Sequence, residues 1–340
     1  RSWNDAEWIS MPQRVGDKIA RLIGSAAGQV VIADSTSVNL FKALSVAVRA
    51  NPGRRVIVSE KANFPTDLHV IQGLIAQLGE GLELVLVDGH EDAIEQCLAQ
   101  RGRDVAVVVL THVHYTTSRM YDMRRLTAAA HQAGAMVIWD LSHTAGVMPV
   151  DLDGCEVDFA VGCGYKHLNA GPGAPAFLYV ARRLQDRFRQ PITGWMGDAR
   201  PFEFRGDYEP AAGITRYLSG TPSVIGMAAL EASVEVILEA PMDEIRRKSI
   251  ALCDAFIDLM DTRCAGKGFE LICSRDGARR GSHLSYRHAS SETLMQALIR
   301  DGVIGDCRPP ELVRFGFAPL YTRYVDLWDA VAKIAAIAMV

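Results

Sequence analysis

Short runs of β-branched and aliphatic residues alternate with longer amphipathic stretches over the first two thirds of the chain. Runs of this kind are typical of buried strands, and the longer stretches carry helical spacing, as Phe41, Leu44 and Val48 do on one face. Regular alternation of strand and helix predicts an α/β fold, with a mainly parallel seven-stranded sheet covered on both faces. The expected strands are 30–33, 56–59, 84–87, 105–110, 136–140, 159–163 and 176–180, and the expected helices are 37–49, 66–78, 92–100 and 122–133.

The pattern changes after residue 180. Residues 181–221 are rich in glycine and proline, which predicts a segment made mostly of loops. A long apolar helix is expected over 223–239, and Pro241 marks a boundary. We therefore expect a large domain at 1–240 and a smaller C-terminal α+β domain at 241–340. The smaller domain is predicted to contain helices at 243–262, at 291–301 and from residue 326 onward, and strands near 269–273 and 282–287.

Composition excludes several classes of protein. The chain has 340 residues, of which 49% are hydrophobic and 22% charged, a balance typical of globular proteins. Its net charge of -4, with Lys and Arg scattered, argues against a surface that binds polyanions. No run approaches the roughly 18 apolar residues that cross a bilayer. Seven cysteines without a C-x-x-C pair indicate reduced thiols in a cytoplasmic protein.

Polar residues follow several of the predicted strands, and ligands of open parallel sheets bind at the carboxyl ends of the strands. The first such segment is Asp34-Ser35-Thr36-Ser37, which opens a helix. Hydroxyl and N–H groups at a helix N-terminus attract an anion such as phosphate. Taken alone, the segment is better explained as an ordinary helix cap.

Two further strand ends carry an aspartate and a lysine. Asp140 ends the strand 136–140, and His143 follows three residues later. A carboxylate there can hold a protonated ring nitrogen, although a turn cap beside a surface histidine explains the pair equally well. Lys166 follows the strand 159–163 in a stretch with few charges along the chain. Desolvation would favour its neutral amine, which can form a Schiff base, whereas most lysines are solvated cations.

These segments share one chemical theme when they are taken in chain order. A cofactor with a phosphate, a pyridinium nitrogen and an aldehyde needs an anion site, an aromatic residue, a carboxylate and a lysine. Pyridoxal 5′-phosphate fits this order. A nicotinamide cofactor does not, because no G-x-G-x-x-G follows the first strand. The sequence therefore predicts a pyridoxal-phosphate enzyme whose large domain, 1–240, binds the cofactor.

The chain resembles the kynureninase family, which belongs to the fold type I, or aspartate-aminotransferase, superfamily of pyridoxal-phosphate enzymes. The resemblance covers nearly the whole chain. Its most specific motif is Tyr165-Lys166 followed by x-Leu-Asn-x-Gly-Pro-Gly, because related cysteine desulfurases place a histidine before the lysine. The other motifs are Arg1-Ser2-Trp3-Asn4, Phe64-Pro65-Thr66-Asp67, Trp139-Asp140-Leu141-Ser142-His143, Gly194-Trp195, Ser219-Gly220-Thr221-Pro222 and the run from Arg314 to Tyr321.

The resemblance implies roles for individual residues. Lys166 would form the Schiff base and move protons, and Tyr165 would hold the phosphate and donate a proton during cleavage. Asp140 would pair with the pyridinium nitrogen, and Arg314 would bind the α-carboxylate of the substrate. The remaining implied cofactor contacts are Ser35 and Thr36 at the phosphate, Phe64 stacked on the ring, Pro65, Thr66 and Asp67 in the same pocket, Thr111 near the ring, His143 beside Asp140, and Trp195 and Thr221 reaching the phosphate from the neighbouring subunit.

The reaction that the resemblance implies is hydrolysis of L-kynurenine, or of 3-hydroxykynurenine, to anthranilate or 3-hydroxyanthranilate and L-alanine. This is a step of tryptophan catabolism that also serves NAD biosynthesis. The implied assembly is a cytoplasmic homodimer with shared active sites and no nucleic-acid or membrane partner. Family members carry a Gly-Asn-Ser-Leu-Gly segment upstream of the region that begins here at Arg1. Because the chain starts without Met, we expect its natural start to lie upstream.

Simpler interpretations and one rival enzyme stay open for these residues. Without the resemblance, Trp195 would fill a hole in the surface, Thr221 would be a turn residue, and Arg314 would be a surface cation. A cysteine desulfurase or selenocysteine lyase needs a nucleophilic cysteine on a loop before the carboxylate-binding arginine. Cys307 lies seven residues before Arg314 and keeps that possibility open.

A metal site and a non-catalytic role are less well supported by the sequence. His112 and His114 form an H-x-H pair, but a metal site needs a third ligand, and His143 is the one nearby candidate. We therefore expect no metal. A non-catalytic protein on the same fold would have no use for Lys166, Asp140 and Arg314 together.

Overall fold

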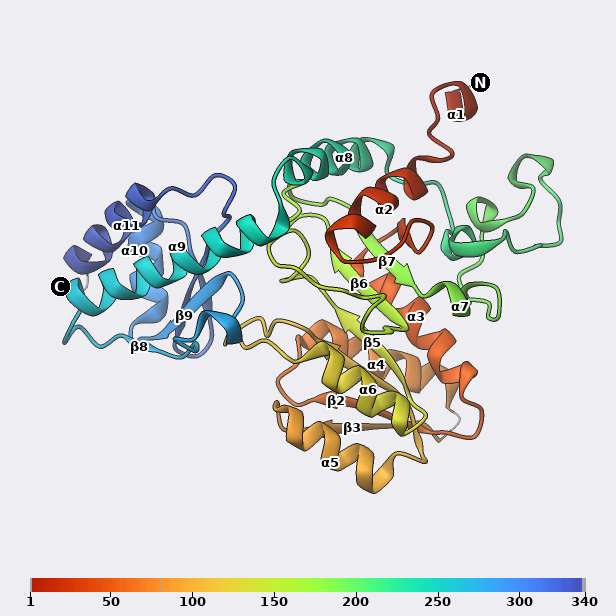
Figure 1. Ribbon diagram of the computed structural model, residues 1–340, viewed down its shortest axis with the longest axis horizontal. Helices are drawn as coiled ribbons and strands as arrows, with labels where there is room; N and C mark the ends of the chain where they lie inside the picture. Colours follow the sequence, from red (N-terminus) through yellow and green to blue (C-terminus); the bar gives the residue numbers. More distant parts are fainter. Residues whose placement is uncertain (1, 80, 338–340) are drawn as a thin grey trace. The chain divides into compact units, whose positions relative to one another are not determined.

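The computed structural model describes residues 2–79 and 81–337, which form two compact units. The first unit contains Arg1–His112 and Tyr121–Glu239, and the second contains Val113–Met120 and Ala240–Val340 (Figure 1). Arg1, the first residue of one motif of the family resemblance, lies outside the described residues.

The sequence-based division at residue 240 differs from these units in one segment. Residues 113–120 pack with the second unit, although they lie between two strands of the first. Arg119 forms a β-bridge with Arg280, and the Gly281 N–H donates to the Ser118 carbonyl at 2.8 Å. These bonds join residues far apart in the chain, which a division into two continuous segments cannot represent.

A seven-stranded sheet forms the centre of the first unit, in the order β1-β7-β6-β5-β4-β2-β3 (Figure 1). The strands from β6 through β5, β4 and β2 to β3 are parallel, whereas β7 is antiparallel to both of its neighbours. The predicted α/β class and all seven predicted strands are confirmed. The strands are β1 (Val30–Ile32), β2 (Val56–Glu60), β3 (Glu83–Val87), β4 (Val105–Thr111), β5 (Met136–Asp140), β6 (Phe159–Cys163) and β7 (Ala176–Val180).

The direction of β7 follows from the segment that precedes it. Residues 164–175, between β6 and β7, form turns and no helix. A parallel neighbour needs a crossover connection, usually a helix, whereas a short helix-free connection reverses the chain. The glycine-rich turn after Lys166 therefore makes β7 the exception in a mainly parallel sheet.

Helices cover the central strands, which is why these strands are continuous apolar runs. Every residue of β4 and of β6 is buried. Helix α3 packs across β4, β5, β6 and β7, while α5 packs on β3 and α6 on β5. The helices of this unit are α1 (Ser2–Asp5), α2 (Met11–Leu22), α3 (Thr36–Ala50), α4 (Pro65–Leu78), α5 (Glu91–Arg101), α6 (Met123–Gln132), α7 (Arg182–Gln185) and α8 (Val224–Leu238). The loop-rich segment contains the 3-10 turns η1 (Trp195–Gly197), η2 (Pro201–Glu203) and η3 (Gly213–Tyr217).

Helix α2 was not expected from the sequence. It packs on β1 and on α8, and a Cβ added at Gly16 would lie 2.2 Å from the Val30 carbonyl oxygen. Arg14 and Lys18 of α2 bind Glu231 of α8 at 2.9 and 2.7 Å. A buried apolar face was present as a signal, because Val15, Ile19 and Leu22 recur at helical spacing.

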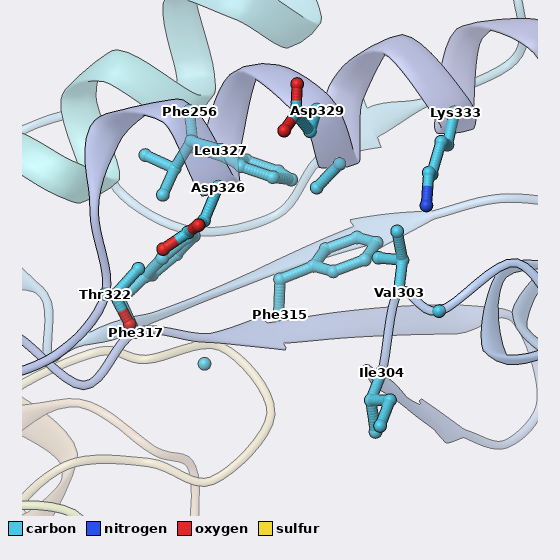
Figure 2. A pocket seen from close by; sticks show the side chains of 13 residues that line it. Phe256, Val303, Ile304, Phe315, Phe317, Thr322, Asp326, Leu327, Asp329 and Lys333 are labelled. Carbon is cyan, nitrogen blue, oxygen red and sulfur yellow. The ribbon is translucent and has the colours of Figure 1, made fainter.

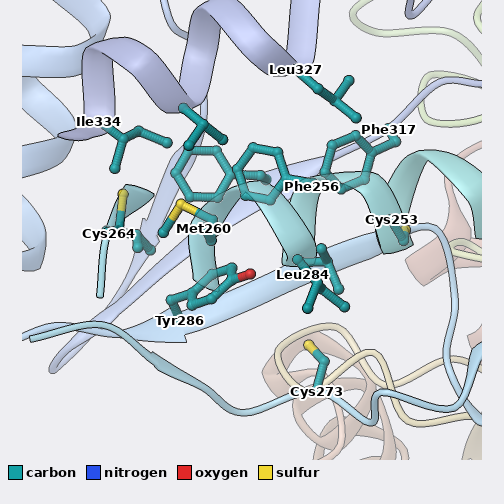
Figure 3. Packing of buried hydrophobic residues seen from close by; sticks show 14 of the residues in the cluster. Cys253, Phe256, Met260, Cys264, Cys273, Leu284, Tyr286, Phe317, Leu327 and Ile334 are labelled. Carbon is teal, nitrogen blue, oxygen red and sulfur yellow. The ribbon is translucent and has the colours of Figure 1, made fainter. Parts of the chain in front are cut away.

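The second unit is a four-stranded antiparallel sheet packed against helices, in the order β10-β11-β9-β8. Figure 3 shows its core, where Phe256 and Met260 of α9 face Leu284 and Tyr286 of β9. The predicted helices and two strands are confirmed, and the hairpin of β10 and β11 is additional. The elements are α9 (Met242–Arg263), β8 (Glu270–Leu271), η4 (Gly277–Arg279), β9 (His283–Arg287), α10 (Ser291–Arg300), β10 (Asp306–Arg308), β11 (Leu312–Gly316) and α11 (Tyr324–Ile337).

No helix within 2–79 or 81–337 has the length and apolar character needed to span a membrane. The seven cysteines are all described, and none forms a disulfide.

Candidate active site

The carboxyl ends of three neighbouring parallel strands bring polar side chains to one edge of the first sheet. Thr111 ends β4, Asp140 ends β5, and these two residues are partners in the strand register. Lys166 follows β6, whose Val161 is paired with Asp140. Because the three strands are parallel, their carboxyl ends meet at one edge, which is where the sequence predicts a ligand.

Asp140 is a buried carboxylate that lies near a cation. It is 5% exposed, and its Oδ1 accepts the Ser142 backbone N–H at 2.7 Å. Burial raises the pKa of this carboxyl, while the nearby Lys166 ammonium and the bonds from Ser142 lower it by less. A carboxylate in this setting is suited to hold a second positive partner, such as a protonated ring nitrogen.

Asp67, in the first turn of α4, is a second buried carboxylate in the same cluster. Burial and repulsion from Asp140 raise its pKa well above the ordinary value, and Lys166 and Thr111 act in the opposite direction. Its Oδ2 has no hydrogen-bond partner among the residues that the structure describes. The Asp67 Oδ2 could therefore accept one further hydrogen bond from a ligand.

Two aromatic rings flank the lysine. The Lys166 Nζ lies 5.9 Å from the centroid of the Phe64 ring and 5.9 Å from that of the Tyr165 ring. Burial, with Cys163 nearby, raises the pKa of Tyr165 to about 12. The Tyr165 phenol is therefore protonated at neutral pH and can donate a proton.

The surroundings of Lys166 in the fold differ from its surroundings along the chain. The stretch of sequence around Lys166 carries few charges, but the fold brings the carboxylates of Asp67 and Asp140 close enough to act on it. These residues come from α4 and β5, so their approach is a property of the tertiary structure. Lys166 is also only partly buried.

The N-terminus of α3 combines an ordinary cap with an unused hydroxyl. The Ser35 Oγ accepts the Val38 N–H at 3.4 Å, so the cap interpretation holds for this residue. The Thr36 Oγ1 is buried and has no partner within the described residues. Within α3, the fully buried Lys42 donates hydrogen bonds to Asp34 at 2.6 Å and to the Tyr217 carbonyl at 2.8 Å. This ion pair was not anticipated, although a lysine on the apolar side of a helix was a signal for it.

The other predicted cofactor residues of the first unit differ in their contacts. Pro65 and Thr66 form the first turn of α4, directly after Phe64. The buried His143 ring lies 6.5 Å from the His167 ring. Trp195 packs 5.4 Å from Trp3 and 6.0 Å from Phe202, so its own chain already places aromatic rings around it. The exposed Thr221 lines a cavity of about 270 Å³, together with Asp34, Gly173 and Ser219.

Asn63 belongs to this cluster and was missed by sequence reasoning. It is buried, its Oδ1 accepts the Thr111 hydroxyl at 2.5 Å, and its Nδ2 donates to Ser59 at 3.0 Å. Its place directly before Phe64 was the available signal. Asn63 thus orients the Thr111 side chain, which acts on Asp67.

Arg314, the predicted carboxylate ligand, lies on β11 of the second unit. Its Nε and Nη2 donate to Oδ1 and Oδ2 of Asp306 at 3.0 and 2.6 Å, and its Nη1 donates to the Tyr115 carbonyl at 2.5 Å. The guanidinium is 11% exposed. The simpler interpretation of Arg314 as a solvated surface cation does not hold.

A separate cavity of about 320 Å³ lies on the other face of this sheet (Figure 2). Phe256, Phe315 and Phe317 give it an apolar wall, and Asp326 and Asp329 lie on α11 at its border. Successive side chains of a strand point to opposite faces, so Phe315 enters the cavity and the neighbouring Arg314 does not.

Cys307 is poorly suited to be a nucleophile. It lies within β10, opposite Val313, and not on a loop. Its thiol donates to the Ser291 carbonyl at 3.2 Å, and burial together with Asp306 and Glu292 raises its pKa. A reactive cysteine needs a lowered pKa, so this environment argues against a desulfurase.

His112 and His114 have other partners than a metal. The His112 Nδ1 lies 3.0 Å from the Thr144 hydroxyl, and the His114 Nδ1 accepts the Thr117 N–H at 3.2 Å. Across the described parts of the chain, no group of three His, Cys, Asp or Glu side chains is arranged to hold a metal ion.

The edge of the sheet fits pyridoxal phosphate chemically. The unpartnered Thr36 hydroxyl, at a helix N-terminus, suits a phosphate, and the buried Asp140 suits a pyridinium nitrogen. Phe64 provides a ring surface, and Lys166 provides the amine. These residues would hold such a cofactor at the carboxyl ends of β4, β5 and β6.

Solved structures place the fold in a known class. A cysteine desulfurase from Thermococcus onnurineus has a TM-score of 0.83 at 18% identity, covering 98% of this chain and 85% of that one. A lysine variant of the enzyme C-DES, solved with glycine covalently linked to its PLP cofactor, has a TM-score of 0.81 at 16% identity, covering 97% of this chain and 86% of that one. The fold is that of the fold type I pyridoxal-phosphate enzymes.

Sequence relatives narrow this class to one family. Residues 245–334 match the family described as the kynureninase C-terminal domain. A kynureninase from Burkholderia pseudomallei is 49% identical over 338 residues, which are 98% of this chain and 80% of the relative. One from Pseudomonas fluorescens is 48% identical over 99% of this chain and 81% of the relative. The chain belongs to the kynureninase family.

Proposed function

We propose that this chain hydrolyses L-kynurenine, or 3-hydroxykynurenine, to anthranilate or 3-hydroxyanthranilate and L-alanine, with pyridoxal 5′-phosphate as cofactor. The observation that carries the proposal is the buried Asp140 with Lys166 beside it, in a chain 49% identical to a kynureninase over 98% of its length. Breaking a bond between Cβ and Cγ needs an electron sink, a base at Cα and a proton donor at Cβ.

The first unit supplies the contacts to the cofactor. When bound, pyridoxal phosphate supplies an aldehyde that condenses with amines and a pyridinium ring that withdraws electrons from the substrate. Asp140 would keep the ring nitrogen protonated through a charge-assisted hydrogen bond. Phe64 would provide the ring surface for the cofactor. Ser35, Thr36 and Tyr165 would bind the phosphate, and Pro65, Thr66, Asp67, Thr111 and His143 would complete the pocket.

Proton movements belong to Lys166 and Tyr165. Lys166 takes the proton from the substrate Cα and delivers it to C4′ of the cofactor. The carboxylates of Asp67 and Asp140 stabilise the ammonium that Lys166 becomes when it takes this proton. Water adds to the γ-carbonyl, the Cβ–Cγ bond breaks, and the protonated Tyr165 phenol supplies the proton that Cβ receives.

Arg314 binds the α-carboxylate of the substrate. An arginine and a carboxylate form two parallel charge-assisted hydrogen bonds, which fix orientation as well as affinity. Orientation matters because the Cα–H bond must stand perpendicular to the ring when Lys166 removes the proton.

The proposal includes the assembly. Two copies form a cytoplasmic homodimer, and Trp195 and Thr221 of one subunit reach the phosphate bound by the other. The exposed Thr221 beside a cavity supports this, and seven unpaired cysteines support a reducing compartment. The proposed partners of this protein are a small amino-acid substrate and a second copy of the chain, and we propose no nucleic-acid or membrane partner.

The test is anthranilate fluorescence after L-kynurenine and pyridoxal phosphate are added to the purified protein, with 3-hydroxykynurenine and L-cysteine run in parallel. We expect anthranilate from the unchanged protein and none from Lys166→Ala, which also loses the visible absorbance of lysine-bound cofactor. Lys61→Ala is the matched control, because Lys61 is an exposed lysine whose partner is Asp88. Turnover by Lys166→Ala, or sulfide release from L-cysteine that Cys307→Ala abolishes, would contradict the proposal.

A further inference from the structure

We infer that Asp306 is a positioning residue for substrate recognition, which holds the Arg314 guanidinium so that one N–H on each of its terminal nitrogens faces the substrate α-carboxylate. The inference rests on the proposed function, because it takes Arg314 as the carboxylate ligand. It adds a residue and a geometric reason that the motif around Arg314 does not contain.

The strand register places the two side chains together. Asp306 of β10 and Arg314 of β11 are direct partners in the antiparallel pair, so both point to the same face. The carboxylate accepts Nε and Nη2 of the guanidinium at 3.0 and 2.6 Å, a two-point contact that fixes the plane of the group.

The number of remaining donors determines what Arg314 can bind. A guanidinium has five N–H donors. Asp306 takes two of them, and the Tyr115 carbonyl takes a third, from Nη1, at 2.5 Å. Within the described residues, one N–H on Nη1 and one on Nη2 remain uncommitted. Two donors on neighbouring nitrogens match the two oxygens of a carboxylate.

The second acceptor of Arg314 is itself held in place. Tyr115 belongs to the segment 113–120, and the next residue, Thr116, accepts the Ser285 hydroxyl at 2.5 Å through its carbonyl. Ser285 is the register partner of Arg314 on β9. Asp306 and the Tyr115 carbonyl therefore belong to one scaffold around Arg314, and a long flexible side chain is ordered before the substrate arrives.

If Asp306 paired with Arg314 and with no other cation, the pair would be neutral and would attract a carboxylate only weakly. The Asp306 Oδ2 also accepts Nη2 of Arg308 at 3.0 Å. Arg308 and Asp306 are two residues apart on β10, so their side chains share the face that carries Arg314. Two guanidiniums and one carboxylate leave one net positive charge. The cluster is thus both ordered and attractive to an anion.

The competing explanation is an ion pair that only stabilises the β10–β11 hairpin. The two explanations differ in what they predict for ligands with and without the α-carboxylate. A positioning residue affects ligands that Arg314 binds, whereas a structural residue affects folding and every ligand alike.

The experiment measures Asp306→Asn in the cofactor-loaded enzyme. Asn keeps the size of the side chain but turns an NH2 donor toward one of the Arg314 donors. We expect kcat/KM for L-kynurenine to fall about ten- to a hundredfold, mainly through KM, with the cofactor absorbance unchanged. Affinity for kynuramine, the analogue without the α-carboxylate, should stay the same. In an Arg314→Ala background, Asp306→Asn should have no further effect on kcat/KM.

Asp261→Asn is the matched control, because Asp261 makes an equivalent two-point pair with Arg275 at 2.8 and 3.0 Å in the same unit. It should change neither KM nor kynuramine binding. If Asp306→Asn does not fold, Asp306→Glu keeps the charge but moves the carboxylate by one methylene, and a raised KM is then expected.

The outcomes separate the two proposals. If the unchanged enzyme does not hydrolyse L-kynurenine, the proposed function fails. If it does, an unchanged KM in the Asp306 variants, an equal loss of kynuramine affinity, or full additivity with Arg314→Ala overturns the role of Asp306.

Discussion

Replacing Asp140 by Asn separates two effects of this carboxylate that act in opposite directions. The Oδ1 accepts the Ser142 N–H at 2.7 Å, and an Asn side chain can keep that bond. In this variant an NH2 group replaces the second carboxylate oxygen, and an NH2 group cannot accept a hydrogen bond from a protonated ring nitrogen. A hydrogen bond to a charged group contributes about 1.5–3 kcal/mol. We therefore expect pyridoxal phosphate to bind roughly ten- to a hundredfold more weakly to Asp140→Asn.

The same substitution should stabilise the cofactor-free protein. Burial raises the pKa of Asp140 in the folded state, so the folded chain binds the proton more tightly than the unfolded chain does. Stability therefore decreases as the pH rises from the unfolded pKa, about 3.9, through the folded value. Each unit between the two values corresponds to about 1.4 kcal/mol. Asp140→Asn removes this loss at pH 7 and makes no difference well below pH 4.

Urea unfolding of the cofactor-free protein at about pH 3 and at pH 7, with a spectroscopic titration of pyridoxal phosphate, measures both effects. Asp158→Asn is the control, because Asp158 is equally buried but accepts the Val137 N–H at 2.8 Å and pairs with Arg183 at 2.7 Å. That variant should lose stability at pH 7 and keep its cofactor affinity. An Asp140→Asn protein that binds the cofactor normally, or that is less stable at pH 7, would refute the reasoning.

Two further predictions concern stability. Salt bridges from Arg14 and Lys18 lower the pKa of Glu231 to about 2, so their contribution is complete above about pH 4.5 and is lost as the pH falls toward 2. The pKa shift of Glu231 corresponds to at most about 3 kcal/mol of stability, and solvent screening at Arg14, which is 37% exposed, reduces this to about 1–2 kcal/mol. Glu231→Gln should therefore lower the free energy of unfolding by that amount in urea at pH 7 and leave it unchanged near pH 2. Phe256→Ala should lower the free energy of unfolding by about 3–5 kcal/mol, because the buried Phe256 ring lies 5.1 Å from Phe315 and 5.3 Å from Phe317 in the core of the second unit. A loss below about 1 kcal/mol in the same assay would contradict that packing.

The strands and the residues at their ends were readable from the chain because their signals are local. A run such as residues 105–110 is apolar along its whole length because both faces of β4 are covered, and that property can be read from consecutive residues. Asp140, which ends β5, could be assigned to the ligand-binding edge for the same reason, whereas Thr111 was placed near the ring by the family resemblance. Lys166 follows β6 by the same logic, and its motif also pointed to the family.

The sequence alone therefore determined the α/β class, the seven strands and the residues at their carboxyl ends. The tertiary structure decided which of those residues act on one another. Asp67 and Asp140 approach Lys166 from α4 and β5, segment 113–120 joins the second unit, and Asp306 meets Arg314 across a hairpin that the pattern did not reveal. Burial and pairing between distant segments set these charges and contacts, and no window of neighbouring residues contains that information.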